Sequence, residues 1–317
     1  MLFAALGVLL MAALLLGAGA LRARALLMET LGSDVAQDEQ EEYVSSFTLR
    51  AEMVSSQMDT RIRGWLSIAP GEEVAVQSPH GRLAGWVYPP VQGGEDAPWA
   101  LVLHGGLGTD HMQVQDVACM LSLAGYRVLT PDLYGHGGSD GNLCALGVAE
   151  AQDVRAWVDW ILAEDMGARI VLLGFDEGAM AALLAACDGL PEAVKAVAAD
   201  SVYRSAEERA RELLSSLHSR AGETDMLLLS AAYRAAFGVE LESGDLIGRI
   251  AQVNLPLLFV HGTGDEDVPA WHSEDLAETI GAELLYIEGA SHGMARFVDH
   301  EAYEDALLSF FEEALAR

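Results

Sequence analysis

The chain has 317 residues, of which 51% are hydrophobic, so it is long enough to fold around one large core. Its 18 basic and 48 acidic residues give a formal net charge of −30 at pH 7. A surface this acidic repels phosphate backbones, so we expect no nucleic-acid partner. The three cysteines are too few and too scattered for a disulfide framework or a zinc cluster. We interpret Cys119, Cys144 and Cys187 as ordinary core or loop thiols.

An uninterrupted run of apolar and small residues opens the chain at Leu2–Leu21. It is about as long as a helix must be to cross a bilayer, and Arg22 and Arg24 follow it directly. We therefore predict a single-pass membrane anchor over residues 1–24. The alternative is a signal peptide that is cut after residues 18–20 and leaves a secreted protein. The run is long for a signal peptide, which favours the anchor.

A polar, partly helical linker is predicted over residues 25–70, and the folded domain over residues 71–317. In this domain, short apolar segments alternate with helical ones. The predicted strands cover residues 83–88, 100–104, 127–130, 169–174, 194–200, 257–261 and 283–287. The predicted helices cover residues 107–125, 147–166, the Ala/Leu-rich segment that follows the turn at 174–178 and runs to residue 186, 273–280 and the terminus from 301. This alternation predicts an α/β fold with a mostly parallel sheet and helices on both faces. Polar helical sequence at about 203–250 interrupts the pattern and predicts an inserted lid.

The segment Gly174-Phe175-Asp176-Glu177-Gly178 stands between a predicted strand and an Ala/Leu-rich helix. Its spacing is that of a nucleophile elbow, whose usual pattern is G-x-S-x-G. Glycines flank the central residue of such a turn because there is no room for neighbouring Cβ atoms. Asp176 occupies the place where serine is expected. The spacing therefore predicts the fold, whereas Asp176 leaves the chemistry open.

Two later residues follow the ends of predicted strands. Asp265 comes just after the strand at 257–261, and His292 lies in a loop after the last strand. The carboxyl ends of parallel strands lie along one edge of the sheet, where ligands usually bind. Asp176, Asp265 and His292 also occur in the order nucleophile, acid, histidine that this elbow accompanies. We therefore predict that the three side chains form one catalytic site.

Two glycine-rich turns follow earlier strands. The turn His104–Gly108 can present backbone N–H groups to a developing oxyanion, or it is simply a tight turn. The loop Pro131–Gly141 contains His136 and Ser139, which we interpret as structural residues that shape the loop.

From about Trp86 to its C-terminus the chain resembles α/β-hydrolases of the serine-aminopeptidase-like, esterase-like group, especially membrane-anchored bacterial members. The resemblance rests on five motifs, and only the serine of the elbow is missing. These motifs are H-G-x-x-G at 104–108, P-D-x-x-G-H-G-x-S-x-G at 131–141, G-x-S-x-G at 174–178, H-G-x-x-D-x-x-V-P at 261–269 and G-x-x-H at 289–292.

The resemblance implies a hydrolase that acts on a small-molecule substrate. In it, Asp265 would orient His292, and His292 would be the general base. The backbone N–H groups of Gly106 and Glu177 would form the oxyanion hole. The resemblance and the motif spacings imply no metal and no organic cofactor.

Asp176 leaves several interpretations. The one that we favour is a hydrolase of ester or amide ancestry with weak or redirected activity; a non-catalytic binding or scaffold protein is the first alternative. A second is an Asp-nucleophile enzyme that acts on alkyl halides or epoxides. Against it, Glu177 stands where dehalogenases carry tryptophan, and the turn at 104–107 lacks the proline of epoxide hydrolases. Tyr203 and Tyr233 lie in or near the lid, where epoxide hydrolases carry two tyrosines, but chance also explains them. A third is a serine that was replaced on purpose to inactivate the protein.

Overall fold

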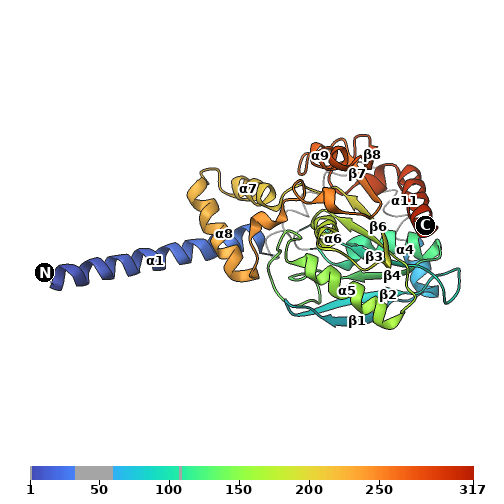
Figure 1. The fold of residues 1–317 in the computed structure, drawn as a ribbon, viewed down its shortest axis with the longest axis horizontal. Coiled ribbons are helices and arrows are strands. Elements are labelled where there is room, and N and C mark those ends of the chain that lie inside the picture. The colour runs from blue at the N-terminus through green and yellow to red at the C-terminus, as the bar shows by residue number, and fades with distance from the viewer. Residues whose placement is uncertain (1, 33–59, 107–108) are drawn as a thin grey trace.

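The computed structural model describes residues 2–32, 60–106 and 109–317, and side chains from residue 17 onward within these ranges. An eight-stranded sheet crosses the molecule (Figure 1) in the order β1-β2-β4-β3-β5-β6-β7-β8. Strand β2 is antiparallel to β1 and β4, whereas β3 to β8 run parallel. The strands are β1 Glu72–Gln77, β2 Arg82–Tyr88, β3 Trp99–Leu103, β4 Arg127–Pro131, β5 Ile170–Phe175, β6 Val194–Asp200, β7 Leu257–Gly262 and β8 Glu283–Ile287. The predicted fold class is confirmed.

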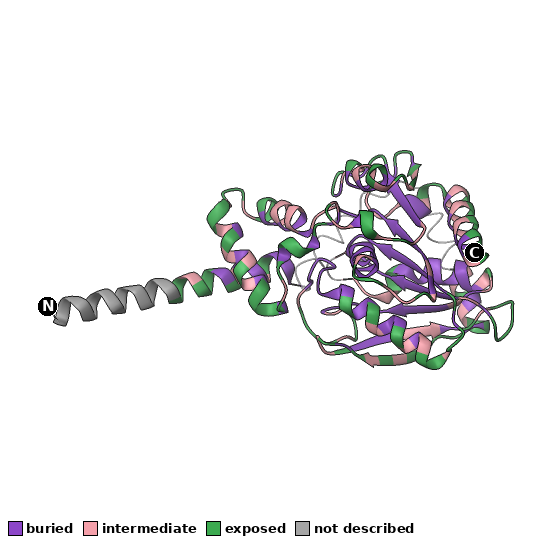
Figure 2. Cartoon of the chain, viewed as in Figure 1, coloured by how far each residue is buried: buried purple, intermediate pink, exposed green. Residues whose placement is uncertain are grey.

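Helices cover both faces of the sheet. The helices of the described residues include α1 Leu2–Leu31, which projects from the body (Figure 1), α4 Gln115–Leu123, α5 Glu150–Glu164, α6 Glu177–Asp188, α7 Ala206–Leu217, α8 Glu223–Phe237, α9 Trp271–Ile280, α10 Ala295–Val298 and α11 His300–Leu315, with short 3₁₀ turns η1 His111–Val114, η2 Leu241–Gly244 and η3 Ile250–Gln252. Alternate residues of β3 enter different cores, one beside α5 and α6 and the other beside α4 and α11. The strand is therefore apolar throughout, and Figure 2 shows the central strands buried.

The segment predicted as one helix over residues 107–125 is shorter in the structure. Residues 107–108 lie outside the described part of the chain. Asp110 accepts a hydrogen bond from the backbone N–H of Met112, caps η1, and α4 begins only at Gln115. The Asp110 carboxylate caps the first turn of η1, so helical structure begins only after Asp110 and not at residue 107.

Helix α1 continues past residue 24, where the sequence predicted a boundary between anchor and linker. Figure 1 shows it as a rod whose C-terminal end reaches the body of the molecule near α7 and α8. Leu26, Leu27 and Leu31 are at most 5% exposed and belong to the core beside α5 and α6. The backbone N–H of Cys144 donates to the carbonyl of Leu31 at 2.8 Å, which joins the end of α1 to the loop before α5. The last turns of α1 are thus part of the folded body.

Within the part of the chain that the structure describes, no helix has the length and apolar character needed to span a membrane. The predicted anchor at Leu2–Leu21 falls mostly on residues whose side chains lie outside that part. The structure therefore gives no support to the predicted transmembrane helix.

Helices α7 and α8 occupy the predicted insertion between β6 and β7. Ser205 begins α7 as its N-cap, because its hydroxyl accepts from the backbone N–H of Glu208. Helix α8 ends at Gly238, which has a φ of 73° in the left-handed region that glycine tolerates. These two helices form the segment that we call the lid segment, residues 206–237.

Candidate active site

Asp176 is the single residue that joins the end of β5 to the start of α6. Its φ is 49° and its ψ is −112°, a conformation that is costly for a residue with a side chain. The two flanking glycines are required by space. A Cβ on Gly178 would lie 2.3 Å from the carbonyl oxygen of His104, and one on Gly174 would lie 2.4 Å from that of Gly178. The turn therefore has the geometry that the G-x-S-x-G spacing demands, with a carboxylate at its tip.

His292 connects the two predicted acids. Its Nδ1 lies 2.8 Å from Oδ2 of Asp265, and its Nε2 lies 3.6 Å from Oδ2 of Asp176. A carboxylate only accepts hydrogen bonds, so the ring donates its Nδ1 proton to Asp265. The structure thus brings together the three residues that the sequence predicted as one site, from loops after β5, β7 and β8.

Asp265 is fixed by its own loop. Its Oδ1 accepts from the backbone N–H groups of Asp267 at 3.1 Å and Val268 at 2.8 Å. Although burial raises the pKa of Asp265, hydrogen bonds from His261, His292 and this backbone lower it well below its ordinary value. These contacts favour the anionic form of Asp265, which accepts the hydrogen bond from His292.

The charges of Asp176 and His292 stabilise each other. Burial lowers the pKa of His292, but Asp176 and Asp265 together raise it well above its ordinary value. Burial raises the pKa of Asp176, and His292 with a smaller contribution from Arg209 makes the net shift downward. The pair is consequently an imidazolium and a carboxylate. While it persists, His292 has no free nitrogen with which to accept a proton.

The turn after β3 lies directly against this pair. A Cβ on Gly105 would meet the carbonyl oxygen of Phe175 at 2.1 Å and Cβ of Asp176 at 2.7 Å. The next residue, Gly106, has a φ of 82°, and Glu177 is the first residue of α6, where backbone N–H groups lack helical partners. Their predicted role as oxyanion donors is compatible with this placement and stays a prediction.

Arg209, on α7 of the lid segment, was not singled out by the sequence. Its guanidinium donates to both carboxylate oxygens of Asp267, at 3.0 and 2.7 Å. Oδ2 of Asp267 lies 3.9 Å from Nε2 of His292, so α7 reaches the loop that carries Asp265. One arginine in a segment rich in Arg and Glu gives no distinguishing signal, and only the tertiary contact reveals it.

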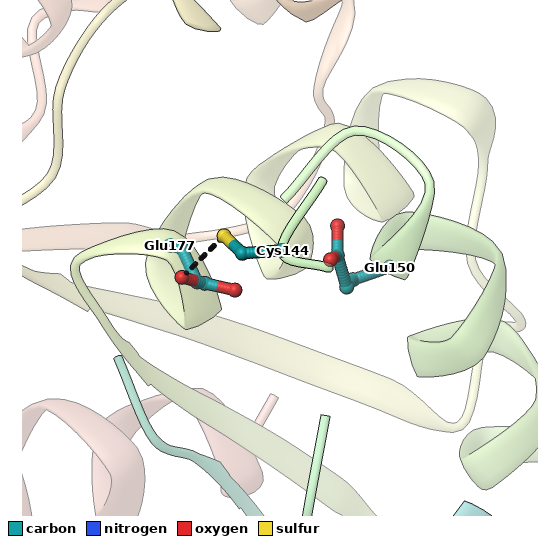
Figure 3. Close-up of side chains that lie close together, drawn as sticks. All are labelled: Cys144, Glu150 and Glu177. Atoms are coloured by element: carbon teal, nitrogen blue, oxygen red, sulfur yellow. Dashed lines mark hydrogen bonds between the residues drawn. The ribbon is translucent and has the colours of Figure 1, made fainter. Parts of the chain in front are cut away.

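The side chain of Glu177 is buried beside Cys144. Its Oε2 accepts from Sγ of Cys144 at 2.9 Å (Figure 3), and it is 1% exposed. Burial raises its pKa to about 8. Glu150, at the start of α5, lies in the same interior region. From the sequence we interpreted Cys144 as an ordinary core or loop thiol and expected no metal. Positions 144, 150 and 177 do not have the spacing of a known metal-binding motif.

The other predicted residues serve the surrounding structure. Ser139 donates to the carbonyl of Asp132 at 2.7 Å and accepts from the backbone of Ala84, which fixes its loop. The hydroxyl of Tyr233 donates to the carbonyl of Ala145 at 2.8 Å and is fully buried. Tyr203 is also buried, at 1% exposure. A tyrosine bonded to backbone in this way is not presented to a substrate.

Comparison with known proteins identifies the family of the fold. Residues 98–229 match the family described as the alpha/beta hydrolase fold. The chain belongs to the α/β hydrolase superfamily. It is 30% identical over 253 residues to an uncharacterized protein of Mycobacterium tuberculosis, an alignment that covers 78% of this chain and 82% of that protein.

Solved structures of hydrolases share the fold. An esterase of Pyrococcus furiosus is 21% identical in sequence, with a TM-score of 0.61. The superposition includes 78% of this chain and 92% of the esterase. The α/β hydrolase GrgF of a Penicillium species is 20% identical in sequence, with a TM-score of 0.60. The superposition includes 78% of this chain and 100% of GrgF. Identities this low show the common fold.

Proposed function

We propose that the protein is a hydrolase of ester or amide ancestry, acting on a small molecule, whose activity is weak or redirected because Asp176 replaces the nucleophilic serine. The observation that carries the proposal is the 2.8 Å contact between His292 and Asp265, which orients the histidine as a serine hydrolase requires. The structurally similar Pyrococcus furiosus protein is an esterase, which favours ester substrates.

Asp176 impairs this chemistry in two ways. A carboxylate that attacks an acyl carbon forms an anhydride, which is an uphill intermediate. In addition, the negative charge of Asp176 keeps His292 protonated, so the ring is not available as a base for water. Both effects have the same origin, a charged group where the mechanism needs a neutral hydroxyl.

The test is the substitution Asp176→Ser, assayed on a short activated ester. The hydroxyl would stand on the same strained turn. His292 would lose the carboxylate that raises its pKa most, which makes the ring available as a base. Restoring a missing member of a triad should raise the rate by at least about a hundredfold. The double variant Asp176→Ser, His292→Ala should lose this gain, which excludes a contaminating esterase. Asp188→Ser, the same change at the far end of α6, should gain nothing.

A second candidate is an Asp-nucleophile enzyme that acts on alkyl halides or epoxides. It is favoured by the ionised state of Asp176 and its 3.6 Å distance from His292. Turnover of such substrates by the unmodified protein, lost in Asp176→Asn, would replace the first proposal with this one. If a folded Asp176→Ser variant gains no esterase activity and the unmodified protein turns over neither class, the protein is a binding or scaffold protein.

The location that we propose rests on the sequence of Leu2–Leu21 alone. This run would hold the protein at a membrane as an N-terminal anchor. Full-length protein should then sediment with membranes and resist extraction with salt. Recovery of uncleaved full-length protein in the soluble fraction would contradict the anchor.

A further inference from the structure

Three buried side chains that can each bind a metal converge behind the Asp176 turn. Cys144 precedes α5, Glu150 is the first residue of α5, and Glu177 is the first residue of α6. One ligand atom from each lies within 4.8 Å of the other two, and Figure 3 shows Cys144 between the two glutamates, with its sulfur directed toward Glu177. All three are at most 1% exposed. They come from the loop before α5 and from the first residues of α5 and α6, which pack against each other, so their convergence is a property of the core.

Each carboxyl group of this cluster has an oxygen without a partner. Oε2 of Glu150 and Oε1 of Glu177 are buried and accept no hydrogen bond from any residue that the structure describes. Neither glutamate forms a salt bridge within the described ranges. Each carboxyl group accepts one hydrogen bond through its other oxygen, but a buried carboxylate with an unpaired oxygen and no counter-ion is still unfavourable, so such groups are normally protonated or bound to an ion.

We propose that Cys144, Glu150 and Glu177 bind a divalent transition-metal ion, with zinc as the ion that best fits this ligand set. A thiolate with two carboxylates suits zinc, whereas calcium and magnesium require oxygen ligands alone. Zinc bonds of about 2.0 to 2.3 Å place tetrahedral ligand atoms roughly 3.3 to 3.8 Å apart. In the structure Sγ of Cys144 lies 2.9 Å from Oε2 of Glu177, closer than this range, and all three ligand atoms are within 4.8 Å of one another. Binding of zinc would therefore replace the thiol-to-carboxylate hydrogen bond and draw Glu150 toward the other two ligands.

Neighbouring backbone groups already orient two of the ligands. The N–H of Ala145 donates to Oε1 of Glu150 at 2.7 Å, and the N–H of Leu146 donates to Sγ of Cys144 at 3.3 Å. Tyr233 holds the same loop through the carbonyl of Ala145. Hydrogen bonds of this kind fix metal ligands and favour their anionic forms. Bound zinc would therefore join the start of α5 to the start of α6, one residue from Asp176.

The experiment uses the full chain, freed of metal with a chelator under reducing conditions and then loaded with Zn²⁺ or Co²⁺. After gel filtration we expect about one ion per chain. The cobalt form should show a thiolate-to-cobalt charge-transfer absorption, which only a cysteine ligand produces. Cys144→Ser should abolish this absorption, and Glu150→Gln should weaken binding at least about tenfold.

Matched variants separate this site from weak binding to the acidic surface. Cys119→Ser changes a buried cysteine in the other core, and Glu164→Gln changes the last residue of α5. Both should keep the absorption and the affinity of the unmodified chain. The proposal is wrong if the unmodified chain shows no cobalt–thiolate absorption. It is equally wrong if the absorption persists in Cys144→Ser, or if Glu150→Gln binds as tightly as Glu164→Gln. The titration of the unmodified chain decides the question even if a variant fails to fold.

Discussion

The carboxylate of Asp176 lies 3.6 Å from Nε2 of His292 and occupies the place beside the histidine where a serine hydroxyl would act. The other ring nitrogen of His292 is bonded to Asp265 at 2.8 Å. The histidine is thus held between two carboxylates, one that orients it and one that keeps it charged. Under the proposed function, Asp265 orients the ring for hydrolysis, whereas the charge of Asp176 opposes its use as a base.

This relationship predicts how His292 titrates. In the unmodified protein its pKa lies well above the ordinary value, with Asp176 as the largest raising influence. Asp176→Asn should lower that pKa, as followed by the ring proton signals in NMR. Because the pKa of His292 is higher in the folded protein than in the unfolded chain, protonation of His292 stabilises the fold. This stabilisation is complete below the unfolded pKa of about 6.5, and it disappears as the pH rises through the folded pKa. An unchanged titration in Asp176→Asn would show that the two groups do not interact.

The strained turn predicts a steep cost for filling Gly178. A Cβ there would lie 2.3 Å from the backbone oxygen of His104, which cannot move without shifting β3. Gly178→Ala should therefore reduce the free energy of unfolding by about 2 to 4 kcal/mol, measured by denaturant titration. Gly64→Ala is the matched control, because a Cβ at Gly64 meets no atom within 4 Å. Equal stability of the two variants would contradict the described packing of the turn.

The end of α1 predicts where truncation begins to harm the fold. Leu26 is fully buried in the core, whereas Leu21 is 72% exposed. Leu26→Ala should lower the free energy of unfolding by about 2 to 5 kcal/mol, and Leu21→Ala should change it by less than about 0.5 kcal/mol. Removal of residues 1–20 should leave the body folded, whereas a chain that starts near Glu42 should be much less stable. A Glu42 start with unchanged stability would show that α1 does not belong to the core.

The lowered pKa of His272 leads us to expect that the free energy of unfolding decreases at acid pH. Its side chain is fully buried on α9, and burial lowers its pKa to about 4, with Glu208 raising it and Arg204, His261 and Arg209 lowering it. Between pH 4 and about 6.5 the unfolded chain binds the proton more tightly, so stability falls as the pH falls through this window. The loss is at most about 3 kcal/mol at pH 4. His272→Gln should show a shallower dependence in the same range, and identical slopes would refute the assignment.

The sequence by itself determined the fold and the chain positions of the predicted site. Strands β6 and β8 have the bounds that the sequence predicted, because each is a short, mostly apolar run between polar or turn-forming segments. The glycines around Asp176 and the placement of Asp265 and His292 after strands were likewise readable, since parallel strands end at one edge. These features depend on local sequence and on a general rule of sheet topology.

Only the tertiary structure decided what surrounds that edge. Arg209 on α7 pairs with Asp267 in the loop after β7, and the end of α1 packs into the core. Cys144 lies close to Glu150 and Glu177, the first residues of α5 and α6. None of these contacts follows from spacing along the chain, because each joins residues whose separation is set by how whole helices pack. The charge of His292 is of the same kind. It depends on the distances to two carboxylates and on their burial, and these exist only once the sheet has assembled.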